Sequence, residues 1–184
     1  QGGSGRAGLA YKKQDGDTLT LTDRIAHHHI ASLATLQATA EKADQLTQEF
    51  RKYYDNNLKK PTGEYKTFVF RADDRSAGNL KALTNYLDQQ QIQYGFAGKS
   101  SSSRGFNYAT GKEESVRVNQ NDLVVSMYQP KSTLVKVLFE PSSNLEDSLT
   151  YDITSWAMPY AFGVQAYALK TRLDPANQKQ TKVA

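Results

Sequence analysis

The sequence contains no cysteine, one tryptophan, two methionines and no long apolar run. Without cysteine, the chain has no disulfide, no thiolate nucleophile and no cysteine-ligated zinc or iron–sulfur site. No apolar stretch approaches the roughly 20 residues that a helix needs to cross a bilayer, so we expect no membrane span. The hydrophobic share of 38% suffices for a core of moderate size but is somewhat low for a compact globule.

Basic residues are in slight excess, and they are scattered along the chain. Lysine and arginine number 23 against 19 aspartates and glutamates, which gives a net charge of +4. Nucleic-acid-binding domains concentrate their basic residues on one face or in one run. The densest pair here, Lys59 and Lys60, stands immediately before Pro61 in a predicted loop. We therefore expect no nucleic-acid partner.

The first 60 residues predict two short strands followed by a long helix. Residues 9–13 and 17–21 read as strands that flank a turn, and Thr20 stands three residues before Asp23, a spacing typical of a capping box. Apolar residues then recur every three or four positions, which predicts one amphipathic helix of about 30 residues. Its apolar positions are Ile25, Ile30, Leu33, Leu36, Ala40, Ala43, Leu46, Phe50 and Tyr53. Residues 59–63 read as a linker.

Residues 64–173 predict a small second domain that opens with a β-α-β unit. The aromatic and β-branched stretch 67–70 is typical of a strand, 76–90 has helical periodicity, and 92–96 reads as a second strand. The remaining expected segments are a polar loop at 99–103, a hairpin around Gly111 (107–109 and 115–118), a strand at 122–127, a helix at 131–139 and a strand at 164–169. We expect an α/β fold, with α+β as the alternative, and a polar tail at 174–184.

Two motifs that suggest cofactor chemistry have simpler explanations. His27, His28 and His29 are the only histidines, and neighbouring side chains on a helix point about 100° apart, so the three cannot converge on one metal ion. Gly3, Gly5 and Gly8 match G-x-G-x-x-G, but no strand precedes them, so we interpret them as a loop. We expect neither metal nor cofactor in this chain.

Two clusters are candidates for ligand binding. Asp73, Asp74 and Arg75 follow a strand and open a helix, where α/β folds place ligands, although helix capping is the favoured explanation. Trp156 and Tyr160 belong to an aromatic segment that suits a carbohydrate or peptide platform, although a core patch is favoured. We find no set of residues that predicts a catalytic centre.

Several longer segments of the sequence resemble one protein family. The stretches 2–9 (GGSGRAGL), 15–28 (DGDTLTLTDRIAHH), 138–141 (LFEP) and 147–160 (DSLTYDITSWAMPY) resemble parts of large bacterial zinc metallocarboxypeptidases related to carboxypeptidase A. The resemblance extends over nearly the whole chain up to Leu173.

The resemblance implies that the catalytic groups lie outside this chain. In that family two histidines and a glutamate hold the zinc well upstream, and the general-base glutamate precedes the glycine-rich loop that opens this sequence. The helix from Asp23 would close the peptidase fold, and residues from about Glu64 would form an accessory domain. Some relatives carry a glutamine-amidotransferase-like module downstream that lacks its catalytic apparatus, and the absence of cysteine here agrees with that.

These expectations describe a non-catalytic segment of a zinc carboxypeptidase-like protein. The parent would release C-terminal residues from peptides by means of zinc-activated water, and would be periplasmic or secreted. This segment would pack on the upstream peptidase domain and shape the access of peptide substrates. Two alternatives stay open, namely a stand-alone ligand- or peptide-binding module and a purely structural domain.

Overall fold

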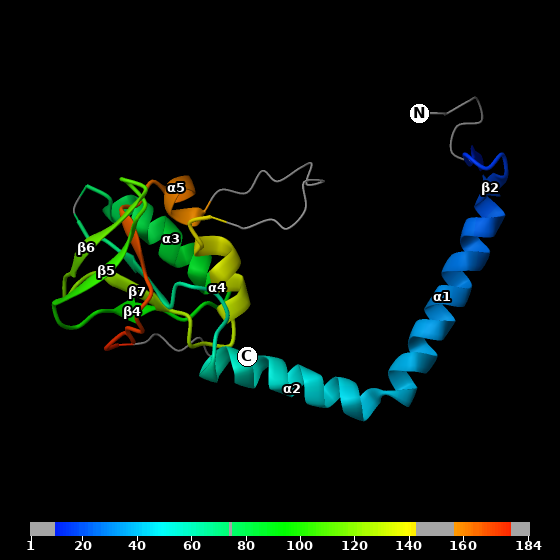
Figure 1. Ribbon diagram of the computed structural model, residues 1–184, viewed down its shortest axis with the longest axis horizontal. Coiled ribbons are helices and arrows are strands. Elements are labelled where there is room, and N and C mark those ends of the chain that lie inside the picture. The colour runs from blue at the N-terminus through cyan, green and yellow to red at the C-terminus, as the bar shows by residue number, and fades with distance from the viewer. Residues whose placement is uncertain (1–9, 74, 143–156, 178–184) are drawn as a thin grey trace. The chain divides into compact units, whose positions relative to one another are not determined.

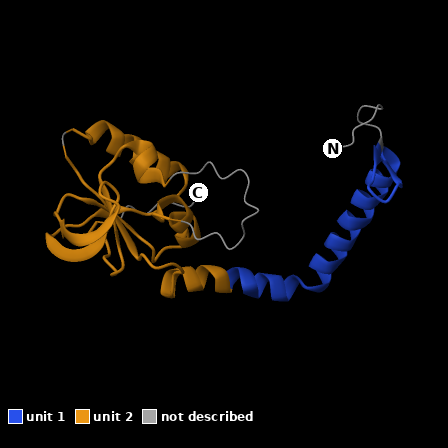
Figure 2. Cartoon of the chain, turned by 45° about the horizontal axis from the view of Figure 1, so that its top comes forward, with its two compact units in different colours: residues 1–51 blue, residues 52–184 orange. Residues whose placement is uncertain are grey.

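The computed structural model describes residues 10–73, 75–142 and 157–177. The chain divides into two compact units, residues 1–51 and 52–184, and each is described by itself (Figure 2). The division falls inside a helix, whereas the sequence suggested a linker at 59–63.

The first unit opens with an antiparallel hairpin of β1 (Ala10–Lys12) and β2 (Thr18–Thr20). The turn between them is closed by the backbone N–H of Lys13, which donates to the Asp17 carbonyl at 2.8 Å. Gly16 has a φ of 88°, in the left-handed region that glycine adopts without steric cost. The two strands and the turn predicted from the sequence are therefore present.

Helix α1 (Leu21–Glu41) begins with the predicted capping box. The Thr20 hydroxyl oxygen accepts from the backbone N–H of Asp23 at 3.2 Å, and the Asp23 carboxylate accepts from the Thr20 backbone N–H at 2.9 Å. Donation by the Thr20 hydroxyl and N–H lowers the pKa of Asp23, so the cap is charged at neutral pH. No described residue of α1 is buried.

The prediction of one continuous helix is wrong. Helix α1 ends at Glu41, Lys42 has non-helical angles (φ −111°, ψ 18°), and α2 runs over Ala43–Lys59. The break coincides with two successive three-residue steps in the apolar pattern, from Ala40 to Ala43 to Leu46. Such steps rotate the apolar stripe around a straight helix, so the two halves cannot keep one common face.

The second unit contains a six-stranded sheet in the order β4-β7-β3-β8-β5-β6, and each neighbouring pair is antiparallel (Figure 1). The strands are β3 (Thr67–Phe70), β4 (Gly95–Phe96), β5 (Ser101–Asn107), β6 (Lys112–Val118), β7 (Leu123–Ser126) and β8 (Ala166–Leu169). The helices are α3 (Ala77–Gln89), α4 (Ser132–Phe139) and α5 (Met158–Phe162). The helix-plus-sheet fold class is confirmed, and the antiparallel pairing corresponds to the α+β alternative.

The predicted β-α-β unit is present with another strand inserted. Both β3 and β4 pair antiparallel with β7, so they run parallel to each other on either side of it. Helix α3 makes the crossover between them. Strand β4 contains only Gly95–Phe96, which is shorter than the stretch 92–96 that the sequence suggested.

The sheet buries side chains on both faces, and its strands alternate accordingly. One face carries Phe68 and Phe70 and packs against α3, α4 and α5, which Figure 1 shows gathered on one side of the strands. The intervening side chain of β3, Val69, belongs to the second face. The second-face cluster comprises Val69, Ala97, Val116, Val118, Val124, Tyr167 and Leu169. Because both faces are covered, β3, β7 and β8 are buried at every position.

The hairpin around Gly111 is longer than predicted, and the expected loop at 99–103 is partly strand. Strand β5 starts at Ser101, which pairs with Val118 of β6, and the hairpin extends beyond the part that pairs with β8. Val116 and Val118 pack in the second-face cluster. The serine-rich sequence has low strand propensity, and the pairing with β6 overrides it.

The stretch 174–177, predicted as part of a polar tail, lies against β4. The backbone N–H of Ala176 donates to the Phe96 carbonyl at 2.9 Å. A Cβ at Gly95 would stand 2.2 Å from the Asn177 carbonyl oxygen, so this approach requires glycine. The end of α2 is also fixed, because the buried Asn57 amide donates to the Pro130 carbonyl at 3.0 Å.

We expect Gly105→Ala to destabilise the second unit. Its Cβ would stand 2.6 Å from the Ala168 carbonyl oxygen, where β5 pairs with β8, and relieving such a clash costs about 1–3 kcal/mol. Gly78→Ala in α3 is the control, because its Cβ meets no atom within 4 Å. Helical glycine-to-alanine replacement stabilises by about 0.5–1 kcal/mol. Urea unfolding followed by circular dichroism measures both changes, and equal midpoints would contradict this account of Gly105.

Candidate ligand-binding site

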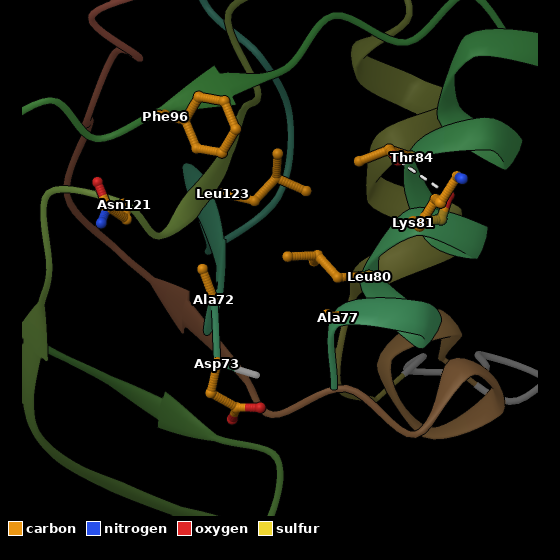
Figure 3. Close-up of a pocket in the computed structure, with 9 residues that line it drawn as sticks. All are labelled: Ala72, Asp73, Ala77, Leu80, Lys81, Thr84, Phe96, Asn121 and Leu123. Atoms are coloured by element: carbon orange, nitrogen blue, oxygen red, sulfur yellow. Dashed lines mark hydrogen bonds between the residues drawn. The ribbon is translucent and has the colours of Figure 1, made fainter. Parts of the chain in front are cut away.

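A depression of about 440 Å³ opens beside the ends of β3 and β4 (Figure 3). It is lined by Ala72, Asp73, Ala77, Leu80, Lys81, Thr84, Phe96, Asn121 and Leu123. These residues come from four places in the chain: the segment after β3, helix α3, strand β4, and the start of β7. The parallel pair β3 and β4 thus points its carboxyl ends at the depression, where open sheets commonly bind ligands.

The floor of the depression is apolar and its rim is polar. Figure 3 shows Leu80, Leu123 and Phe96 facing the space between α3 and the strands. Leu123 is buried, Leu80 is half-buried, and Phe96 is 48% exposed at the edge of the sheet. Asp73 and Asn121 lie at the outer margin with Lys81. An apolar group of a ligand can lose its water on this floor while polar groups of the same ligand contact the rim.

A buried ion pair fixes the strand ends that form this margin. The Arg71 guanidinium contacts the Asp122 carboxylate at 2.6 Å, and Asp122 has no exposed surface. The other carboxylate oxygen accepts from the backbone N–H of Ala72 at 3.3 Å. Asp122 also accepts from the backbone N–H of Asn119 at 2.8 Å. One carboxylate therefore joins the end of β3 to the turn that leads into β7.

Arg71 extends the same network to two further strands. Its second terminal nitrogen donates to the Arg117 carbonyl of β6 at 2.9 Å. Its guanidinium carbon lies 5.2 Å from the centre of the Tyr167 ring on β8, within cation–π range. The charged side chain is thus paired, hydrogen-bonded and stacked, as a largely buried arginine requires.

Asp73 is the charged carboxylate on the rim. The backbone N–H and the hydroxyl of Ser76 both donate to its Oδ1 atom, each at 2.7 Å. These two hydrogen bonds lower the pKa of Asp73, the hydroxyl more than the N–H. The carboxylate organises the turn that precedes α3 and stays ionised at neutral pH, but it caps no backbone N–H within the helix, because its partner Ser76 is the N-cap residue and α3 begins at Ala77.

The other predicted site residues do not join this depression. Arg75 is exposed beside Asp73 but does not line it. Tyr160 is 44% exposed and lies against the Tyr108 ring at 5.4 Å between centroids, in an edge-on arrangement. Asp74 and Trp156 lie outside the described residues. The structure therefore brings only Asp73 from the predicted set to the depression.

The Tyr160 ring continues a row of aromatic side chains rather than a separate platform. Phe106 meets Tyr108 edge-on at 5.4 Å, and Tyr65 meets Phe106 at 6.5 Å. Tyr108 is buried and donates from its hydroxyl to the Phe139 carbonyl, and burial raises its pKa. Partial burial and donation to Glu113 raise the pKa of Tyr65 to about 12. Only Tyr108 of this row is buried, Tyr65 and Phe106 are half-buried, and Tyr160 is exposed.

Sequence reasoning missed Lys81, Phe96 and Asn121 at the depression. Each belongs to a separate segment, and only the strand order β4-β7-β3 brings the segments together. Local sequence patterns do not predict that strand order. The one available signal was the position of Asp73 between a strand and a helix.

Comparison with protein-family models, curated proteins and solved structures gave no significant match. The site must therefore be interpreted from its own chemistry. Among residues 10–73, 75–142 and 157–177, no three histidine, aspartate or glutamate side chains are grouped so that they could hold a metal ion. None of the helices in these ranges is long and apolar enough to cross a membrane.

We expect Asp122→Asn to destabilise the second unit by about 3 kcal/mol, because it leaves a largely buried guanidinium without its counter-charge. Asp174→Asn is the matched control. Its ion pair with Arg172 has 53% exposed side chains on both partners, and exposed pairs contribute about 0–1 kcal/mol. Guanidinium chloride unfolding of both variants measures the difference. A loss for Asp122→Asn no greater than for Asp174→Asn would contradict this role.

Proposed function

We propose that this chain is a non-catalytic segment of a zinc carboxypeptidase-like protein. It would pack on the peptidase domain of the same polypeptide and shape the access of peptide substrates. The proposal combines the resemblance of the sequence with one structural observation, the apolar side chains that α1 and α2 leave exposed.

Helices α1 and α2 would be stabilised by a surface that buries their exposed apolar side chains. Those of α1 are Leu21, Ile25, Ile30, Leu33 and Leu36, and those of α2 include Leu46, Tyr53 and Leu58. Leu36 is 67% exposed. Isolated helices are marginal in water, and most helical stability in proteins comes from packing an amphipathic face. A partner surface, such as the rest of a peptidase fold, would supply that packing.

The resemblance assigns the catalytic chemistry to another part of the polypeptide. Zinc peptidases need three protein ligands and an activated water. Among the described residues no such set of ligands occurs, and the resemblance assigns the ligands and the general base to upstream positions. The catalytic step would therefore belong to the peptidase domain, with this segment contributing contacts and shape.

The depression beside Asp73 favours a second candidate, a ligand- or peptide-binding module. It combines an apolar floor with a charged rim, as small-molecule sites commonly do. The two candidates are compatible, since an accessory domain can both pack on an enzyme and bind part of its substrate.

Two observations on the longer gene product test the proposal. The coding sequence upstream of Gln1 should encode a strand that ends in glutamate, and a His-x-x-Glu motif further upstream. Deletion of residues 64–173 from that protein should change the ratio of kcat/KM for long and short peptide substrates. Unchanged kinetics together with unchanged thermal stability would contradict the proposal.

Substitutions on the apolar face of α1 test the packing directly. We expect Leu33→Asp and Leu36→Asp each to destabilise the longer protein by about 1.5–3 kcal/mol, the value of burying one leucine. Ala38→Asp adds the same charge on the other side of the helix and should have little effect. The same variants in the 184-residue chain should leave the unfolding of the second unit unchanged. Thermal denaturation measures both, and equal effects of all three variants would count against a packed face.

A further inference from the structure

We propose that the depression between α3 and strands β3, β4 and β7 binds an α-amino group together with the large apolar side chain next to it. The ligand class is the amino-terminal residue of a peptide or a free amino acid, of the leucine or phenylalanine type. This inference rests on the second unit alone and does not depend on the proposed packing against a peptidase domain.

The apolar side chains on the floor of the depression indicate that part of the ligand is apolar. Leu123 is buried at the base, Leu80 comes from α3, and Phe96 forms a wall that is 48% exposed. Figure 3 shows these side chains facing the same space. Its volume of about 440 Å³ lies within the range of roughly 300–1,000 Å³ typical of small-molecule sites. An aliphatic or aromatic side chain of the ligand would replace water over Leu80 and against the Phe96 ring.

The carboxylate on the rim of the depression indicates that the ligand carries a positive charge. Asp73 lines the depression and carries a negative charge at neutral pH, because Ser76 donates twice to its carboxylate. An ammonium group of the ligand would pair with this carboxylate at the margin of the depression. Lys81 and Asn121 stand elsewhere on the rim and offer donors to the ligand carbonyl or carboxylate. A phosphate or a second carboxylate at Asp73 would be repelled.

Peptide titrations with the 184-residue chain test the site. The probes are Phe-Gly-amide, free phenylalanine, N-acetyl-phenylalanine amide and Gly-Gly-amide. Binding of each probe is measured from the chemical shifts of the protein's backbone amides. We expect Phe-Gly-amide to shift Ala72, Ala77 and Leu80, and Gly-Gly-amide to bind at least tenfold more weakly. Acetylation, which removes the positive charge, should weaken binding about threefold, the size of an exposed ion pair. The comparison of Phe-Gly-amide with free phenylalanine distinguishes a peptide end from an amino acid.

Matched variants separate the two parts of the site. Phe96→Ala should weaken Phe-Gly-amide binding about tenfold, as expected for losing one aromatic wall. Tyr160→Ala is the control, because its ring is similarly exposed at 44% but does not line the depression. Asp73→Asn should weaken binding about threefold and abolish the difference between free and acetylated peptide. Lys112→Gln, on the edge strand β6, should leave binding unchanged.

Several outcomes would overturn the proposal. The site is wrong if no amide of the depression shifts up to the solubility limit of the peptides, or if Tyr160→Ala weakens binding as much as Phe96→Ala. The assigned charge is wrong if acetylated and free peptides bind equally well. Shifts of the same amides that depend on protein concentration without peptide would identify a second copy of the chain as the occupant. Unfolding curves of Phe96→Ala and Asp73→Asn that match the parent chain exclude misfolding as the cause of weaker binding.

Discussion

The second unit depends on one carboxylate buried between its strands. Asp122 accepts from the Arg71 guanidinium and from two backbone N–H groups, and it has no exposed surface. Burying an ionised carboxylate is costly unless it is paired and hydrogen-bonded, and here both conditions hold. The arrangement therefore works only with β3, the turn before β7 and the guanidinium all in place. Replacing one partner removes the compensation for burying the other.

The candidate site follows from the same interaction. Asn121 and Leu123 flank Asp122, and Ala72 donates to it, so three lining residues are positioned by one carboxylate. Asp73 follows Ala72 and is held from the other side by Ser76 of the turn into α3. The backbone N–H and the hydroxyl of Ser76 thus hold the rim carboxylate in one position. A margin that is already ordered in this way lowers the conformational entropy that the protein would lose when a ligand binds.

The sequence predicted features whose cause is local and missed those whose cause is distant. The capping box of Thr20 and Asp23 was predictable because both partners lie within one helical turn. Helix α3 followed from its apolar periodicity. The start of β5 at Ser101 was not predictable, because pairing with Val118 of β6 creates it. Likewise Phe96 and Asn121 reach Asp73 only through the strand order, which no local pattern records.

The apolar residues of the chain are mostly buried in the second unit and exposed in α1. The hydrophobic share of 38% therefore does not describe a single core. In the second unit they fill two clusters that cover both faces of the sheet. In α1 they stay exposed, although the capping box is complete. A cap satisfies backbone groups at the first turn, but it cannot replace the burial that stabilises a helix in water. The second unit therefore buries its own apolar side chains, whereas the described contacts leave the apolar side chains of α1 exposed.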